Sequence, residues 1–167
     1  MKSFQKIFIL LFLFYSCKVE KNTNSKEEWV SLFNGKDLNG WNIKIANHSL
    51  NDNFNNTFQV QDSMIRVVYT EYDDFDDKYG HMYYKTPYSY YKLRFDYRFI
   101  EEQTSGGENW NIRNSGVMIH SQSAKSNAFE QHFPVSLEIQ LLGGLNKGER
   151  TTANLCTPGT AVYFNDK

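Results

Sequence analysis

The chain has 167 residues, with 18 Lys and Arg against 19 Asp and Glu, and a net charge of −1 at pH 7. Because the basic residues are also scattered, the sequence does not indicate a nucleic-acid surface or a polybasic membrane surface. Two cysteines in a chain of this length exclude a disulfide-rich scaffold.

The N-terminal residues predict export. Lys2 and Lys6 precede an apolar run, residues 7–15, that is too short to span a bilayer as a helix. Residues 13–17 resemble a bacterial lipoprotein box, so Cys17 is the expected lipidation site. A plain secretory signal is the alternative. We expect a signal peptide over residues 1–16. The mature protein is expected to be an exported cell-envelope lipoprotein, in the outer membrane or facing the periplasm, and to be held to the membrane through Cys17.

The segment after the expected lipidation site is a predicted tether. Residues 17–28 are charged and polar and show no periodicity, a composition that cannot bury enough apolar surface to fold. The remaining residues 29–167 fit one domain with a sizeable core.

Strand signals dominate this domain, and no window has a helical period of sufficient length. Residues 32–41 contain two Asn-Gly pairs, which favour turns, and end on Trp41, a large anchor for a core. Two short runs, residues 58–61 and 64–68, flank Asp-Ser and predict a hairpin. The acidic residues 71–77 lack the glycine and terminal glutamate of a helix-loop-helix calcium motif, so we expect a solvated loop there.

The clearest alternation lies in residues 91–99, where apolar or aromatic residues alternate with charged ones. This pattern predicts a half-buried antiparallel strand. After a glycine-containing loop, residues 115–120 form the next predicted strand, with Gly116, Met118 and His120 on one face.

Residues 134–144 predict a strand with two different faces. One face is aliphatic, with Val135, Leu137, Ile139 and Leu141, whereas Glu138 and Gln140 stand together on the other face, roughly 7 Å apart. Polar groups aligned in this way favour a functional site, although an exposed sheet face without a ligand gives the same pattern.

The last residues predict an incomplete fold. Residues 161–164 read as a strand and residues 165–167 as the start of a turn whose return strand is missing, so the domain is expected to be truncated at its C-terminus. Cys156 is either a small buried hydrophobe or paired outside this sequence. The many short strands and turn residues together predict an all-β domain, a β-sandwich of jelly-roll type.

Three motifs taken in order resemble one bacterial family. Residues 32–41, 113–120 and 138–140 are similar to the domain of unknown function 1080 family, described as 3-keto-disaccharide hydrolases or 3-keto-glucoside lyases and hydratases. Residues 151–160 look like a further block of a lipoprotein-rich branch. The resemblance implies a concanavalin A-like jelly roll, an exported location and a carbohydrate substrate with a ketone at carbon 3, cleaved by elimination or hydrolysis.

The ketone makes the expected chemistry possible, because it acidifies the proton on carbon 2 so that a base can remove it. Retaining glycosidases place two carboxylates about 5 Å apart. Gln140 takes the place of a second acid here, which disfavours ordinary hydrolysis and leaves Glu138 as a general base or a metal ligand. His120 is the second catalytic candidate, as an acid or a ligand.

A His, a carboxylate and a carboxamide can together hold a divalent cation, which would act as a Lewis acid on the ketone. The candidate metal ligands are Glu138, His120 and Gln140, and a hydrogen-bonded histidine at a strand end is the alternative for His120. The candidate sugar-binding residues are Gln140, Arg113, Asn114 and His81. A non-catalytic carbohydrate-binding lipoprotein would use the same face, and a copy inactivated by early termination is the third possibility.

Overall fold

The computed structural model describes residues 28–100, 102–163 and 165. The expected signal peptide, Cys17 and most of the expected tether therefore lie outside the described residues. The chain divides into two units, residues 1–30 and residues 31–167, and the second unit contains all the elements below. No helix among the described residues is long and apolar enough to cross a membrane.

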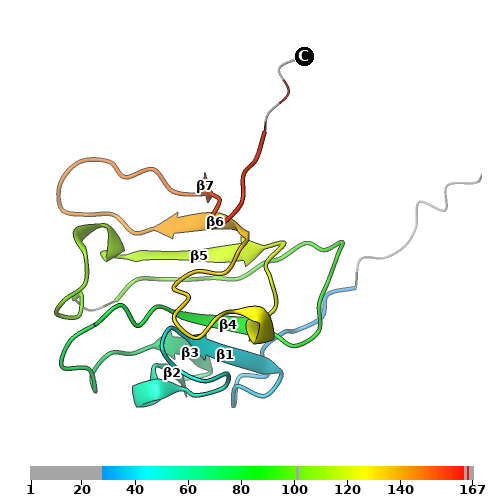
Figure 1. Cartoon of the computed structure of the whole chain (residues 1–167), viewed down its shortest axis with the longest axis horizontal. Coiled ribbons are helices and arrows are strands. Elements are labelled where there is room, and N and C mark those ends of the chain that lie inside the picture. The colour runs from blue at the N-terminus through cyan, green and yellow to red at the C-terminus, as the bar shows by residue number, and fades with distance from the viewer. Residues whose placement is uncertain (1–27, 101, 164, 166–167) are drawn as a thin grey trace, which may run out of the picture. The chain divides into compact units, whose positions relative to one another are not determined.

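The described part consists of short strands and 3₁₀ turns (Figure 1). The strands are β1 (Trp41–Ile45), β2 (Phe58–Gln61), β3 (Met64–Val67), β4 (Gly80–Tyr84), β5 (Asn114–Ile119), β6 (Leu137–Leu142) and β7 (Asn154–Cys156). The 3₁₀ turns are η1 (Phe54–Asn56), η2 (Asn109–Asn111) and η3 (Ala124–Ser126). The prediction of an all-β fold is confirmed, whereas the jelly-roll topology stays a prediction.

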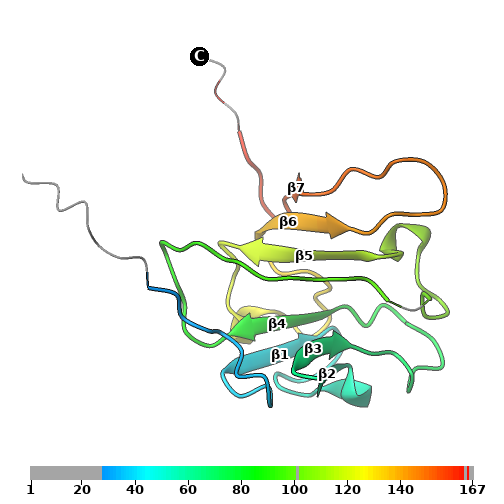
Figure 2. The same ribbon diagram turned by 180° about the vertical axis from the view of Figure 1, so that it is seen from behind.

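Three antiparallel sheets organise these strands. Strand β1 pairs with β4, β2 pairs with β3, and β6 lies between β5 and β7. The view from behind shows β5 and β6 on one side of β4, and β1, β2 and β3 on the other (Figure 2). The third sheet carries the polar residues that the sequence analysis singled out.

The β2–β3 hairpin is as predicted. Its strands are joined by Asp62 and Ser63, whose φ angles of 52° and 56° give the two left-handed residues of a hairpin turn. The core lies where this hairpin meets the first sheet, with Ile43, Ile45 and Phe58 buried. Burial of these three apolar side chains stabilises the packing of the hairpin on this sheet.

The opposite face of the β1–β4 sheet contains a buried charge. The Lys44 ammonium donates hydrogen bonds to the carbonyl oxygens of Ile45, His48 and Phe129, at 2.9, 2.8 and 3.1 Å. Burial lowers the pKa of Lys44. Because Phe129 is far away in sequence, this network attaches the segment after β5 to the first sheet.

The strand predicted over residues 91–99 is wrong, because these residues form no strand ladder. Leu93, Phe95 and Tyr97, which alternation placed on a buried face, remain 44 to 49% exposed. Alternation reports which side chains share a face, but a strand also needs a hydrogen-bonded neighbour at the right register. The strand predicted at the C-terminus is likewise not formed over its described residues 161–163.

Candidate functional site

The predicted polar face exists on the β5–β6–β7 sheet. Glu138 on β6 lies between Met118 of β5 and Cys156 of β7, and the next pair of rungs places Gln140 between Gly116 and Asn154. Since side chains alternate across a strand, these six residues occupy one face, and Leu137, Ile139 and Leu141 point the other way. The prediction that Glu138 and Gln140 stand together is confirmed.

The Glu138 side chain lies directly over Gly116. A Cβ atom at Gly116 would collide with Oε1 of Glu138 and lie only 2.6 Å from its Cγ. The carboxylate therefore occupies the space that a side chain on the neighbouring strand would fill. This half-buried position raises the pKa of Glu138, because burial disfavours the charged form.

Gln140 is oriented by Asn154, a residue to which sequence reasoning gave no role. Asn154 Nδ2 donates to Gln140 Oε1 at 3.1 Å, and the backbone oxygen of Gln140 accepts from the Ala153 amide at 2.7 Å. Because the Gln140 amide oxygen accepts from Asn154, the Gln140 donor group Nε2 is directed away from Asn154. The sequence signal for this residue is its place in residues 151–160, two residues before Cys156. Only the pairing of β6 with β7 shows that its partner is Gln140.

Cys156 faces Glu138 across the β6–β7 pair and is a free cysteine. Burial and the negative charge of Glu138 both raise the pKa of its thiol. A thiol with a raised pKa is a poor nucleophile at neutral pH. We therefore assign Cys156 no nucleophilic role.

His120 follows the last residue of β5 and does not continue the alternation. Its φ of 49° turns the backbone into the left-handed region, and its side chain is exposed. Across residues 28–100, 102–163 and 165, no three or more His, Cys, Asp or Glu side chains are grouped as a metal site. The proposed set of Glu138, His120 and Gln140 contains only two residues of those types, so its metal role stays a prediction.

Arg113 and Asn114 lie at the start of β5 and bond to neighbouring loops. Arg113 Nη1 donates to the Gly144 oxygen at 2.7 Å, and Asn114 Nδ2 donates to the Trp110 oxygen at 2.9 Å. Both side chains therefore hold the backbone at this end of the sheet. Their predicted contact with sugar stays a prediction.

His81 lies on β4, in a different sheet from Glu138. Its ring is buried, and Nε2 lies 2.7 Å from the backbone oxygen of His132. Burial lowers the pKa of His81, and the nearby positive charge of Lys44 acts in the same direction. The structure therefore gives His81 a role in attaching the segment after β5, beside its predicted role in sugar binding.

This buried histidine gives a pH-dependence of stability. In the unfolded chain, the imidazole titrates near 6.5, whereas in the folded chain its pKa lies lower. As the pH falls below about 7, the His81 imidazole takes up a proton in the unfolded chain at a higher pH than in the folded chain. The free energy of unfolding therefore decreases, by at most about 1.4 kcal/mol per pH unit. We expect the urea midpoint of the wild type to fall between pH 7 and pH 5, and less so for His81→Gln. An equal fall of the urea midpoint with pH in the two proteins would contradict the assignment of this pH-dependence to His81.

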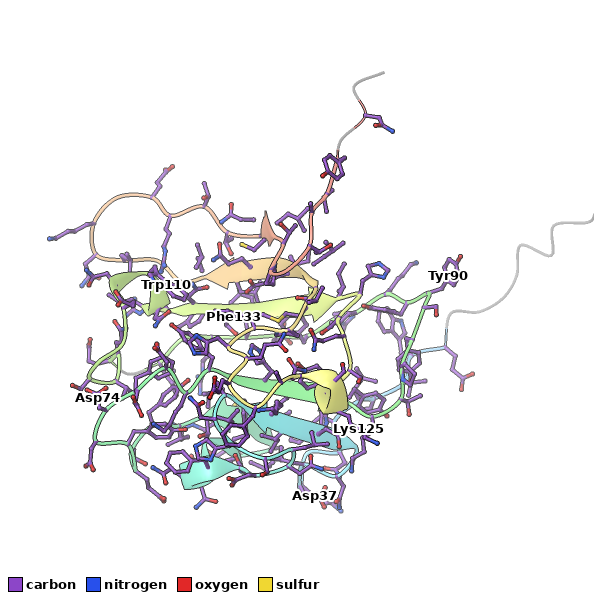
Figure 3. All side chains as sticks on the ribbon, viewed as in Figure 1. Asp37, Asp74, Tyr90, Trp110, Lys125 and Phe133 are labelled. Atoms are coloured by element: carbon purple, nitrogen blue, oxygen red, sulfur yellow. The ribbon has the colours of Figure 1, made fainter. Side chains whose placement is uncertain are left out.

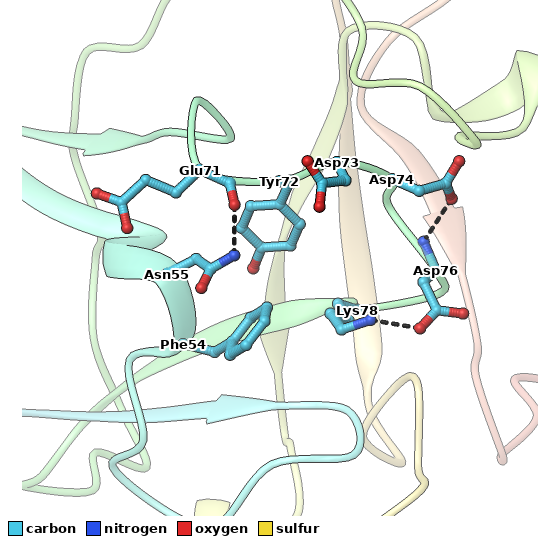
Figure 4. A pocket seen from close by; sticks show the side chains of 8 residues that line it. All are labelled: Phe54, Asn55, Glu71, Tyr72, Asp73, Asp74, Asp76 and Lys78. Atoms are coloured by element: carbon cyan, nitrogen blue, oxygen red, sulfur yellow. Dashed lines mark hydrogen bonds and ion pairs between the residues drawn. The ribbon is translucent and has the colours of Figure 1, made fainter.

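The acidic loop lines a pocket on another part of the chain (Figure 4). The pocket is formed by Phe54, Asn55, Glu71, Tyr72, Asp73, Asp74, Asp76 and Lys78. The faces of the Phe54 ring are occupied, since His48 stacks on it at 4.1 Å and Lys78 Nζ lies 5.7 Å from its centroid. Asp76 pairs with Lys78, and the carboxylates are exposed, as expected for a solvated loop.

Comparison with known proteins identifies one relationship. A family model described as a 3-keto-alpha-glucoside-1,2-lyase-like domain matches residues 28–166. The chain matches no curated protein and no solved structure. The matched range includes the whole β5–β6–β7 sheet.

Proposed function

Because the chain belongs to the 3-keto-alpha-glucoside-1,2-lyase-like domain family, we propose that it cleaves the glycosidic bond of 3-keto-glycosides by elimination or net hydrolysis. The observation that supports this most is the half-buried Glu138 carboxylate, held over Gly116 on the same face as Gln140. A carboxylate with a raised pKa is a stronger base than one in water.

The proposed reaction removes the proton from carbon 2 and expels the group on carbon 1. Glu138 takes the proton, the C–H electrons form an enolate with the ketone at carbon 3, and collapse of the enolate makes a carbon 1–carbon 2 double bond. The glycosidic C–O bond breaks and its oxygen leaves with a proton, so the products are an unsaturated keto sugar and the released alcohol. Addition of water to the double bond in a second step gives net hydrolysis.

The neighbouring side chains have supporting roles in this proposal. The Gln140 amide, whose oxygen accepts from Asn154, would donate a hydrogen bond to a sugar oxygen beside Glu138. His120 at the end of β5 is the proposed acid that protonates the leaving oxygen. Arg113, Asn114 and His81 complete the proposed sugar-binding set.

A divalent cation is a further part of the proposal. Glu138 and Gln140 lie on the same face of β6 and both carry a side-chain oxygen, the ligand type that hard cations prefer, and His120 would be the third ligand in place of its role as the acid. Such a cation would stabilise the enolate oxygen as a Lewis acid. Loss of turnover on chelation would support the cation, and full turnover in the presence of chelator would contradict it.

The experiment compares a 3-keto-disaccharide with the same disaccharide before oxidation, each with and without chelator, and measures the released sugar. We expect release from the keto sugar alone, because only the ketone acidifies carbon 2. Equal release from both would contradict elimination. Saturable binding without release would instead favour a carbohydrate-binding protein that uses the same face.

We also propose that the protein is an exported lipoprotein anchored through Cys17, on the basis of the charged, apolar and Ser-Cys segments of the N-terminal sequence. Labelling with a fatty-acid analogue in cells is expected to mark the wild type and not Cys17→Ser. Labelling of both proteins would contradict the anchor.

A further inference from the structure

An exposed tryptophan stands at one end of the sheet that carries Glu138. Trp110 lies in η2 and is 50% exposed. Its indole stacks nearly parallel on the Tyr79 ring, with the ring centroids 5.9 Å apart and an angle of 7° between the planes. The centroid of the Phe133 ring lies 6.3 Å from that of the indole. Figure 3 shows Trp110 and Phe133 near β5. The indole is thus supported by aromatic rings, while the residue stays half exposed to solvent.

The backbone under this indole is fixed by two side chains. The Trp110 oxygen accepts from Asn114 Nδ2 at 2.9 Å and from Arg150 Nη2 at 3.5 Å. Arg150 also donates through Nη1 to the oxygens of Ile112 and Gly143, which connects η2 to the end of β6. An exposed aromatic ring held in this way binds a ligand without losing much side-chain entropy.

The first of these hydrogen bonds places the Trp110 backbone beside Asn114, a candidate sugar-binding residue. Asn114 shares its face of β5 with Gly116 and Met118, and Met118 is the rung partner of Glu138. Met118 lies four positions along the strand from Asn114, about 14 Å along the sheet. Gln140, paired with Gly116, lies between the two ends.

We propose that Trp110 is a stacking subsite for a second sugar ring of the substrate, beyond the ring that reacts at Glu138; this inference rests on the proposed function. The C–H face of a pyranose is apolar and packs on the face of an indole, whereas its hydroxyls stay at the rim. Glu108 and Asn109, which precede Trp110 and are exposed, provide acceptors and donors for such hydroxyls. The remainder of the polar face, from Gln140 to Glu138, then receives the ring that carries the ketone.

The test measures specificity rather than rate alone. Wild type, Trp110→Ala and Trp110→Phe are compared on a 3-keto-disaccharide and on a methyl 3-keto-glucoside, which has no second ring. We expect the ratio of kcat/KM for the disaccharide to kcat/KM for the methyl glycoside to fall five- to tenfold in Trp110→Ala, the size of an aromatic contact. Trp110→Phe retains most of the ratio because the phenyl ring still stacks.

Tyr90 provides a matched control, because it is 98% exposed and lies away from Trp110 in Figure 3. Tyr90→Ala is expected to keep the wild-type ratio. An unchanged ratio in Trp110→Ala overturns the subsite while the proposed function stands. If the wild type shows no turnover, the subsite is tested by titrating the tryptophan fluorescence of the protein with the 3-keto-disaccharide. A saturable fluorescence change that is lost in Trp110→Phe and Trp110→Ala supports the subsite in a protein that binds sugar without cleaving it. No fluorescence change in the wild type overturns the subsite.

Discussion

Replacing Glu138 with Gln is expected to lower kcat for a 3-keto-disaccharide by at least about 100-fold, because removal of a positioned general base costs this much or more. The amide has nearly the same shape as the carboxylate, so it fits over Gly116 as the native side chain does. It cannot accept the proton from carbon 2. The measurement is the rate of sugar release at saturating substrate.

The control for this variant is substrate binding. Because Gln replaces a group that is half-buried and ionisable by one that is neutral, the fold and the affinity for sugar are expected to be retained. Equilibrium binding of the 3-keto-disaccharide therefore stays close to that of the wild type. Turnover within a few-fold of the wild type would contradict the assignment of Glu138 as the base.

Gly116→Ala is expected to reduce kcat by about 10- to 100-fold while the protein remains folded. The new Cβ would occupy the space of the Glu138 carboxylate, so the side chain has to move from its place beside Gln140. Small displacements of a catalytic group cost rate on this scale. The accompanying loss of stability is expected to be about 1 to 3 kcal/mol, typical of overpacking.

Gly144→Ala is the matched control, because a Cβ at Gly144 would meet no atom within 4 Å. It makes the same chemical change close to the same sheet and is expected to leave both rate and stability near the wild type. Wild-type kcat in Gly116→Ala would show that the position of the Glu138 carboxylate over β5 does not matter for turnover.

The sequence was sufficient for the features that depend on local patterns. Asp62 and Ser63 predicted the hairpin because small polar residues tolerate the left-handed turn, and both have positive φ. Alternation placed Glu138 and Gln140 on one face, and the β5–β6 register confirms it. Glu138 and Gln140 also belong to one of the three motifs that carry the family resemblance.

The features that the sequence could not supply depend on contacts between distant residues. Alternation over residues 91–99 could not show that no ladder forms there, because the partner strand is not encoded in the segment itself. The strand pattern also placed His120 in line with Met118, but a left-handed residue ends the alternation. Asn154 and Trp110 became visible only when pairing placed them beside Gln140 and Asn114.

The proposal that Glu138 removes the proton from carbon 2 is tested most directly by isotope exchange at that carbon. The 3-keto-disaccharide is incubated in D₂O with wild type or Glu138→Gln, and deuterium at carbon 2 is measured in the recovered substrate and the hydrated product. We expect deuterium at carbon 2 with the wild type and little with Glu138→Gln. Sugar release by the wild type with the original hydrogen retained at carbon 2 would contradict elimination and indicate direct glycoside hydrolysis.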